Sequence, residues 1–171
     1  MTLNMPSYSV DWVTQITPPM LHRMHVKAIL LDVDNTLSPP DSQIPFSGTI
    51  QWVQKMQNNG FKLIILSNNF KWRVAPFAAQ YGLPYVSFAL KPLPVGYLRA
   101  MSKLHVRRSE TVAIGDQIFT DILGANLVGL QSILVTPRIT EGSASFLRRR
   151  HWEQSIRQEL KNTGRHISPK E

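Results

Sequence analysis

Short apolar runs alternate along the chain with stretches that carry helix signals. The runs are the length of strands and are apolar at successive positions, which is typical of strands buried on both faces of a parallel sheet. We predict five such strands, at residues 27–32, 62–66, 84–88, 111–114 and 131–135. The predicted helices lie between them, at residues 48–59, from beyond Asn69 to about Tyr81, and at 94–104 and 115–127.

Glycine and proline mark the ends of these predicted helices. Gly60 and Gly82 indicate where the first and second helices end, and Pro94 is placed to begin the third. Pro76 falls in the second helix, and we predict that it either begins this helix or kinks it.

Strands and helices that alternate at this spacing are typical of βαβ units. The sequence therefore predicts an α/β fold with a five-stranded parallel sheet and helices on both faces. We assign residues 27–137 to this core and residues 1–26 to an N-terminal segment packed on it. Residues 138–171 are predicted to form a basic C-terminal extension that is helical and then frayed from Asn162. In such a sheet, ligands bind beyond the carboxyl ends of the strands.

The composition excludes several classes of site and of protein. The chain of 171 residues has no cysteine, which rules out disulfides, thiolate metal ligands and cysteine nucleophiles. Its apolar runs are far shorter than the ~18–20 residues of a membrane-spanning helix. Residues 1–13 lack the basic start and apolar centre of a signal peptide, and Asp11 would interrupt one. We therefore expect a cytoplasmic protein.

The charge balance points to an anionic partner. The chain has 19 basic and 11 acidic residues, a formal net charge of +8, which attracts anions but is also typical of a well-solvated surface. Residues 146–152 interleave aromatic side chains with arginines, which suits peripheral contact with the anionic inner face of a membrane. The same composition suits nucleic acid. We slightly favour a third reading, a helix that packs Phe146, Leu147 and Trp152 on the core and leaves its arginines in solvent.

Polar side chains follow four of the predicted strands where each one ends. Asp32 and Asp34 follow the first, Ser67 and Asn68 the second, Lys91 the third, and Asp116 and Asp121 the fourth. Carboxylates hold Mg²⁺ and can act as nucleophiles, while a lysine and a hydroxyl bind phosphate oxygens. These residues are therefore the parts needed for phosphoryl transfer.

The same residues form motifs in a fixed order: Asp-x-Asp-x-Thr at 32–36, then Ser67, then Lys91, then Gly-Asp-x₄-Asp at 115–121. In this order they resemble the haloacid dehalogenase superfamily. The finer pattern of Leu-Asp-x-Asp-Asn-Thr-Leu, Ser-Asn-Asn and Gly-Asp-Gln-x-x-Thr-Asp-x-x-Gly-x-Asn is similar to its YqeG-like subfamily, which includes phosphatidylglycerophosphate phosphatases. The similarity extends over about residues 16–137. One such motif recurs by chance, whereas four in order at strand ends are a specific signal.

The resemblance implies a phosphatase that works through an aspartyl-phosphate. Asp32 would attack the phosphorus, and Asp34 would protonate the leaving oxygen and then activate the water. Ser67 would donate a hydrogen bond to the phosphoryl oxygens, and Lys91 would neutralise charge. Substrate-binding roles fall to the backbone near Asn35 and Asn68, and to Arg73, which either reaches a substrate phosphate or is a solvated residue.

The resemblance also implies Mg²⁺ as the cofactor. The carboxylates of Asp32 and Asp116 and the backbone carbonyl of Asp34 would hold the ion. Asp121 would add an acidic contact, either directly or through another ligand.

The superfamily inserts cap domains at two places, and neither has room for one here. Only residues 37–48 precede the next helix in one place, and one helix and one strand fill residues 91–116 in the other. We therefore expect an open site, unless a second subunit of an oligomer covers it. An open site does not desolvate a small metabolite on all sides, so it suits a phosphomonoester on a lipid headgroup better.

We favour phosphatidylglycerophosphate as the substrate. One alternative is a phosphatase for a soluble nucleotide or sugar phosphate. The other belongs to a different class, an RNA- or ribosome-associated binding protein with an incidental phosphatase site.

Overall fold

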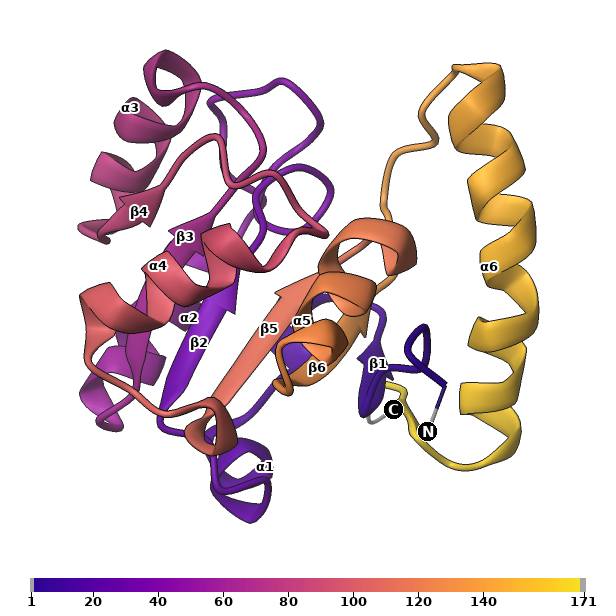
Figure 1. Ribbon diagram of the computed structural model, residues 1–171, viewed down its shortest axis with the longest axis horizontal. Helices are drawn as coiled ribbons and strands as arrows, with labels where there is room; N and C mark the ends of the chain where they lie inside the picture. Colours follow the sequence, from indigo (N-terminus) through magenta and orange to yellow (C-terminus); the bar gives the residue numbers. More distant parts are fainter. Residues whose placement is uncertain (1, 170–171) are drawn as a thin grey trace.

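The five predicted apolar runs form adjacent parallel strands in the computed structural model, which describes residues 2–169 (Figure 1). Each strand is buried along most of its length, as expected where helices cover both faces. The strands are β2 (Ala28–Leu31), β3 (Lys62–Leu66), β4 (Tyr85–Val86), β5 (Thr111–Gly115) and β6 (Gln131–Val135).

The sheet has seven strands, so the prediction of five was wrong. The order is β4-β3-β2-β5-β6-β1-β7, in which β1 (Tyr8–Val10) and β7 (His166–Ile167) extend the sheet beyond β6. Both added strands run parallel to their neighbours, and Ser9 pairs with His166. Strands of three and two residues are too short to show a hydrophobic period, and the partner of β7 lies at the other end of the chain.

Helices on the two faces bury two separate sets of strand side chains. Ile29, Leu31 and Ile65 point to the face covered by α1 (Pro18–Arg23), α2 (Thr49–Asn58) and α3 (Lys71–Tyr81). Leu30 and Ile64 point to the other face, covered by α4 (Pro94–Leu104) and α5 (Leu123–Leu127). This alternation along each strand produces the predicted doubly covered sheet.

Two local predictions about helices need correction. Pro76 is the sixth residue of α3, so it does not begin the helix. The helix predicted to open at Gly115 and Asp116 starts later, with a π-helical turn at Ile118–Ile122 that leads into α5.

The segment before β2 packs its apolar side chains on the α1–α3 face. Val10, Ile16 and Leu21 are buried there, and the indole Nε1–H of Trp52 donates to the carbonyl of Ile16 at 2.8 Å. Trp12 stays about half exposed beside the guanidinium of Arg138. The division into segments at residues 26 and 137 stays a prediction.

The C-terminal extension differs from its prediction in two respects. It forms one long helix, α6 (Ala144–Asn162), which lies beside the end of the sheet that holds β1 and β7 (Figure 1). Leu147 and Trp152 are exposed, and the buried residues of α6 are Glu153 and Leu160, so the predicted aromatic packing was wrong. Beyond the helix the chain turns into β7 rather than fraying, and residues 170–171 lie outside the described residues.

The two places predicted to lack a cap domain hold short connections. Residues 38–48 form a loop without helix or strand, and residues 92–115 contain α4, a short 3₁₀ turn and β5. Within residues 2–169, no helix is both long and apolar enough to cross a bilayer.

Candidate active site

The carboxyl ends of β2, β3 and β5 and the loop after β4 surround one small hollow of about 260 Å³. Six predicted site residues line it: Asp32, Asp34, Ser67, Asn68, Lys91 and Asp121. Asn69, Gln117, Thr120, Phe146 and Arg149 complete the lining. The hollow is smaller than the ~300–1,000 Å³ of typical ligand pockets, so it suits a phosphoryl group better than a whole large molecule.

Lys91 joins the two aspartates on either side of it. Its ammonium Nζ lies 2.8 Å from Oδ1 of Asp32 and 2.5 Å from Oδ1 of Asp121, and it also donates to the carbonyl of Leu66. The lysine is almost fully buried. Its backbone is held in turn by Asn68, whose amide Oδ1 accepts from the Lys91 N–H and whose Nδ2 donates to the Lys91 carbonyl.

The surroundings of Asp32 and Asp116 disfavour the charged forms of these two carboxyl groups. Burial and the nearby Asp121 carboxylate raise the pKa of Asp32 to about 6, although Lys91 acts in the opposite direction. Burial, followed by Asp32 and Asp121, also raises the pKa of Asp116 well above its usual value. Burial alone would lower the pKa of Lys91, but Asp121 and Asp32 outweigh it and raise the pKa.

Three of the aspartates can hold a metal ion. One carboxylate oxygen from each of Asp32, Asp116 and Asp121 lies within 4.8 Å of the others. Asp116 is completely buried, and its Oδ1 has no hydrogen-bond partner. A buried carboxylate oxygen without a donor fits a cation, and hard cations such as Mg²⁺ prefer oxygen ligands. The side chain of Asp34 is not part of this group.

A glycine lets β5 approach Asp121 closely. A Cβ atom at Gly115 would collide with the Asp121 carboxyl group, so a larger residue there would displace it. Asp121 is also held by its backbone, because its carbonyl accepts from the buried Tyr97 hydroxyl of α4 at 3.0 Å. The glycine of the Gly-Asp motif therefore has a steric role in the site.

Asp34 is oriented by two side chains that follow β3. Arg73 Nη2 lies 3.0 Å from its Oδ1, and Asn69 Nδ2 donates to its Oδ2 at 2.8 Å. Ser67 lies next to them with its hydroxyl accepting from the Asn69 N–H, which leaves the hydroxyl proton free to donate. The carboxylate of Asp34 and the hydroxyl of Ser67 thus border the hollow together.

Two residues predicted to bind substrate lie outside the lining of the hollow. Arg73 is buried and contacts Asp34, so the alternative prediction that it is a solvated residue was wrong. Asn35 is also buried; its side chain bonds to the backbone of Ile139 and to the Glu141 carboxylate. This contact ties the first motif loop to the start of the C-terminal extension.

Sequence reasoning missed the contributions of Asn69 and of helix α6. Arg149 lines the hollow with Phe146, over whose ring its guanidinium lies, and Arg150 forms an ion pair with Asp116. The arginine run was visible in the sequence, but no pattern placed it against the carboxyl end of β5. Asn126, which had no assigned role, holds the N-terminal segment by donating to the carbonyls of Leu3 and Met5.

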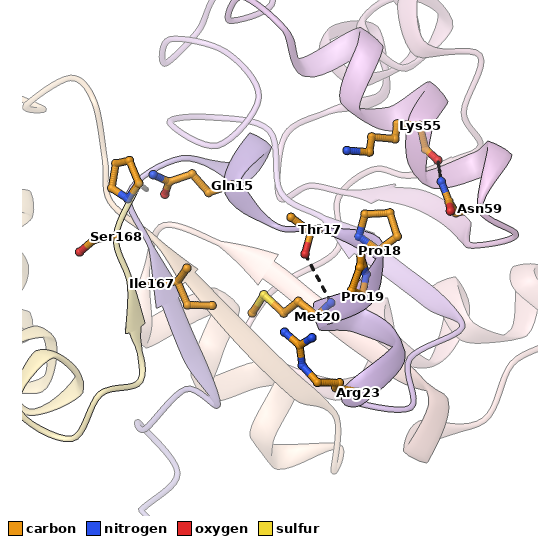
Figure 2. Close-up of a pocket in the computed structure, with 11 residues that line it drawn as sticks. Gln15, Thr17, Pro18, Pro19, Met20, Arg23, Lys55, Asn59, Ile167 and Ser168 are labelled. Carbon is orange, nitrogen blue, oxygen red and sulfur yellow. Dashed lines mark hydrogen bonds between the residues drawn. The ribbon is translucent and has the colours of Figure 1, made fainter. Parts of the chain in front are cut away.

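A larger hollow of about 750 Å³ lies among α1, α2 and β7, away from the predicted site (Figure 2). Thr17, Arg23, Lys55 and Ile167 are among its lining residues. Among residues 2–169, no carboxylate lines this hollow, so these residues offer neither a nucleophile nor a cation site of the kind described above.

Comparison with known proteins decides which family this arrangement represents. Residues 38–129 match the model of the haloacid dehalogenase-like hydrolases. The chain is also 36% identical over 162 residues to the probable phosphatase YqeG of Bacillus subtilis, covering 94% of this chain and 93% of the relative. The chain belongs to the haloacid dehalogenase-like hydrolase family. With phosphatases among its relatives, this family member is a phosphoric monoester hydrolase of the YqeG-like type.

Two further similarities concern phosphatases of a phospholipid. Residues 1–73 match the family model of mitochondrial PGP phosphatase. A probable mitochondrial phosphatidylglycerophosphatase of Schizosaccharomyces pombe is 30% identical over 125 residues, which cover 65% of this chain and 60% of that protein.

Solved structures of the haloacid dehalogenase-like family share the fold. The L-2-haloacid dehalogenase of Xanthobacter autotrophicus matches 81% of this chain and 88% of its own with a TM-score of 0.55 at 15% identity. The deoxy-D-mannose-octulosonate 8-phosphate phosphatase of Haemophilus influenzae matches 81% and 91% with a TM-score of 0.53, also at 15% identity. Similarity at this identity supports the α/β fold and nothing finer.

Proposed function

We propose that the protein is a Mg²⁺-dependent phosphatase that forms an aspartyl-phosphate on Asp32. The observation that carries this proposal is the position of Asp32. Its carboxylate belongs to the three-aspartate cluster, contacts the Lys91 ammonium, and lines the same hollow as Asp34. A nucleophile, a positive charge and an acid-base group are thus brought to one small volume.

The chemistry divides into two displacements at phosphorus. In the first, an Asp32 oxygen bonds to phosphorus as the ester P–O bond breaks, and Asp34 gives its proton to the leaving alcohol oxygen. In the second, Asp34 takes a proton from water, whose oxygen attacks the phosphorus and breaks the bond to Asp32. Ser67 and Lys91 hold the phosphoryl oxygens during both displacements.

The metal would be held by Asp32, Asp116 and Asp121, with the backbone carbonyl of Asp34 as a further ligand. Mg²⁺ bound there supplies charge neutralisation for the phosphoryl oxygens. The unpartnered Oδ1 of Asp116 and the mutual repulsion of the three carboxylates support a cation at this position.

Phosphatidylglycerophosphate is the substrate that we propose. The two matches to phosphatidylglycerophosphate phosphatases support it. The shape of the site supports a lipid headgroup, because the hollow holds little more than a phosphate and short connections stand where cap domains would be. The rest of the substrate would therefore stay outside the protein, as it does for a lipid in a bilayer.

Exposed aromatic side chains near the site fit a membrane surface. Phe70 directly follows Asn69, and Phe88 lies in the loop after β4 that also holds Lys91; their half-exposed rings stack with centroids 5.5 Å apart. On α6, the exposed Trp152 borders a shallow apolar hollow with Arg148 and Arg149. Aromatic rings and arginines together favour the interface of an anionic bilayer. We propose a cytoplasmic protein that contacts the inner face of the membrane.

A comparison of substrates tests the lipid assignment. Phosphate release would be measured with phosphatidylglycerophosphate in mixed micelles, with glycerol 3-phosphate, and with nucleotide and sugar phosphates, each in the presence of Mg²⁺. We expect kcat/KM for the lipid to exceed that for the soluble esters by at least about 100-fold, since binding energy from the lipid interface is absent for the others. Equal or greater values for a soluble ester would overturn the lipid assignment and keep the phosphatase mechanism.

A further inference from the structure

Helix α6 is attached to the core through charged side chains. Its two buried residues are Glu153 and Leu160, whereas the apolar Leu147 and Trp152 face solvent. Arg150, Glu153 and Arg157 follow one another at spacings of three and four residues, which place them on one side of the helix. A buried glutamate between two arginines indicates that this side has a specific partner in the core.

That partner is the backbone and side chain of Asp116, directly after β5. Arg150 Nη2 lies 2.6 Å from Oδ2 of Asp116, and Arg150 Nη1 donates to the Asp116 carbonyl at 2.7 Å. Arg157 Nη2 donates to the same carbonyl at 3.0 Å. Such a two-point contact between a guanidinium and one residue fixes orientation as well as charge.

Glu153 completes the attachment from the same side of the helix. Its Oε1 accepts from the Ile118 N–H at 2.9 Å, and its Oε2 lies 3.1 Å from Arg150 and 3.4 Å from Arg157. The helix therefore binds residues 116–118, which lead into the π-helical turn that carries Asp121. Removing Arg150 would leave the buried Asp116 carboxylate without its ion-pair partner, and removing Glu153 would leave the buried Ile118 N–H without an acceptor.

The two oxygens of Asp116 have different surroundings. Oδ2 is taken by Arg150, whereas Oδ1 is buried and has no partner. We propose that Arg150, braced by Glu153, is a positioning residue for the cation site: it fixes Asp116 through Oδ2 so that Oδ1 is available to the ion. The C-terminal helix is then a working part of the metal centre, and this inference rests on the proposed metal-dependent function.

Titration with Mg²⁺ in the absence of substrate tests this directly. Mg²⁺ binding to the full-length protein would be measured by calorimetry for the wild type, Arg150→Ala, Arg150→Lys and Lys161→Ala. Lys161 is an exposed lysine on the same helix, so its replacement removes the same charge without touching Asp116. We expect the Kd for Mg²⁺ to rise about 10–100-fold in Arg150→Ala, the range typical of groups that orient metal ligands.

The other variants separate positioning from charge alone. Arg150→Lys keeps the charge but lacks the planar two-point contact, so it should restore only part of the affinity. Lys161→Ala should bind Mg²⁺ as the wild type does. In activity assays, Arg150→Ala should raise the Mg²⁺ concentration needed for half-maximal rate while leaving the KM for substrate at saturating Mg²⁺ unchanged.

Each failure has its own meaning. Equal Mg²⁺ affinities for the wild type and Arg150→Ala would overturn the role of Arg150 and leave the proposed phosphatase intact. Lack of Mg²⁺ binding in the wild type would overturn the metal-dependent function and this inference together. If circular dichroism finds Arg150→Ala unfolded, Arg150→Lys and Glu153→Gln test the inference in its place. Both should bind Mg²⁺ more weakly than the wild type. Unchanged Mg²⁺ affinity in both would overturn the inference.

Discussion

The guanidinium of Arg73 lies 3.0 Å from Oδ1 of Asp34, a residue that lines the hollow surrounded by the strand ends. Arg73 itself does not line this hollow, whereas Asp34 does. The arginine is therefore placed to orient the acid-base group and not to touch the substrate.

This contact predicts a specific kinetic effect for Arg73→Met. Loss of the guanidinium leaves Oδ1 of Asp34 held only by the backbone N–H of Asp41 at 3.1 Å, and a misplacement of about 1 Å in a reacting group can lower the rate about 100-fold. Steady-state kinetics should find kcat reduced by about that factor with little change in KM. A large rise in KM with unchanged kcat would instead mean that Arg73 binds the substrate phosphate.

When the acid-base group itself is replaced, the effect on the two displacements should depend on the leaving group. In Asp34→Asn, both steps should slow by about 10²–10⁴-fold with an alkyl phosphate, since neither the leaving group nor the water can exchange a proton with residue 34. A nitrophenyl leaving group needs little protonation, so rapid mixing should then find a burst of nitrophenol followed by slow turnover. Unchanged rates with both substrates would remove Asp34 from the mechanism.

The raised pKa of Asp32 predicts a pH-dependent cost to stability. The folded protein keeps the Asp32 proton up to about pH 6, because burial and Asp121 raise its pKa from 3.8 to about 6. The folded state therefore binds more protons than the unfolded state between these values, and stability falls as pH rises through this window. Two pKa units correspond to about 3 kcal/mol in the free energy of unfolding.

Urea unfolding in the presence of a chelator measures this cost. Asp32→Asn lacks the titrating group, so its free energy of unfolding should fall less between pH 4 and pH 7 than that of the wild type. At pH 7 the variant should have the larger free energy of unfolding. Added Mg²⁺ should stabilise the wild type and so reduce the difference in free energy of unfolding between the two proteins. Parallel pH profiles for the two proteins would contradict the assigned environment of Asp32.

Much of the fold and the site could be predicted because the signals are local. Continuous apolar runs marked the five adjacent strands β2 to β6, and glycines marked helix ends such as that of α3 at Gly82. Once the strands were placed, the rule that parallel strands deliver their ends to one edge brought Asp32, Ser67 and Lys91 together. The structure places these three side chains around one hollow.

The features that could not be predicted depend on contacts between distant parts of the chain. β1 and β7 pair through residues 157 positions apart, as in the Ser9–His166 hydrogen bond, and strands this short have no recognisable period. The run around Arg150 looked like a solvated face, because a sequence does not show that its partner is the buried Asp116. Ion pairs with a core carboxylate hold α6 in place together with a short apolar contact made by Ile156 and Leu160.

The structure also sharpens the membrane prediction. Arg150 is engaged with Asp116, which leaves Arg148 and Arg149 as the exposed members of the arginine run. Replacing both by alanine should weaken binding to vesicles that contain anionic lipid by about 30-fold, since each arginine near such a surface contributes about 1 kcal/mol. Vesicle sedimentation measures this change.

A matched control is available at the opposite end of β5. Arg107 and Arg108 are exposed and lie at the 3₁₀ turn before this strand, at the end away from the site. Replacing both removes the same charge and should change vesicle binding little. An equal loss of vesicle binding in the two double variants would mean that binding depends on net charge alone. Unchanged vesicle binding in both would mean that α6 has no role at the membrane.

The most direct measurement is Mg²⁺-dependent phosphate release from phosphatidylglycerophosphate by the wild type and by Asp32→Asn, with folding of both checked by circular dichroism. The wild type should release phosphate only with Mg²⁺, and chelation should abolish the activity. Asp32→Asn should be inactive although folded, because an amide cannot form the phosphoryl bond. Release by Asp32→Asn at a rate near that of the wild type would contradict the nucleophilic role of Asp32 and with it the proposed mechanism.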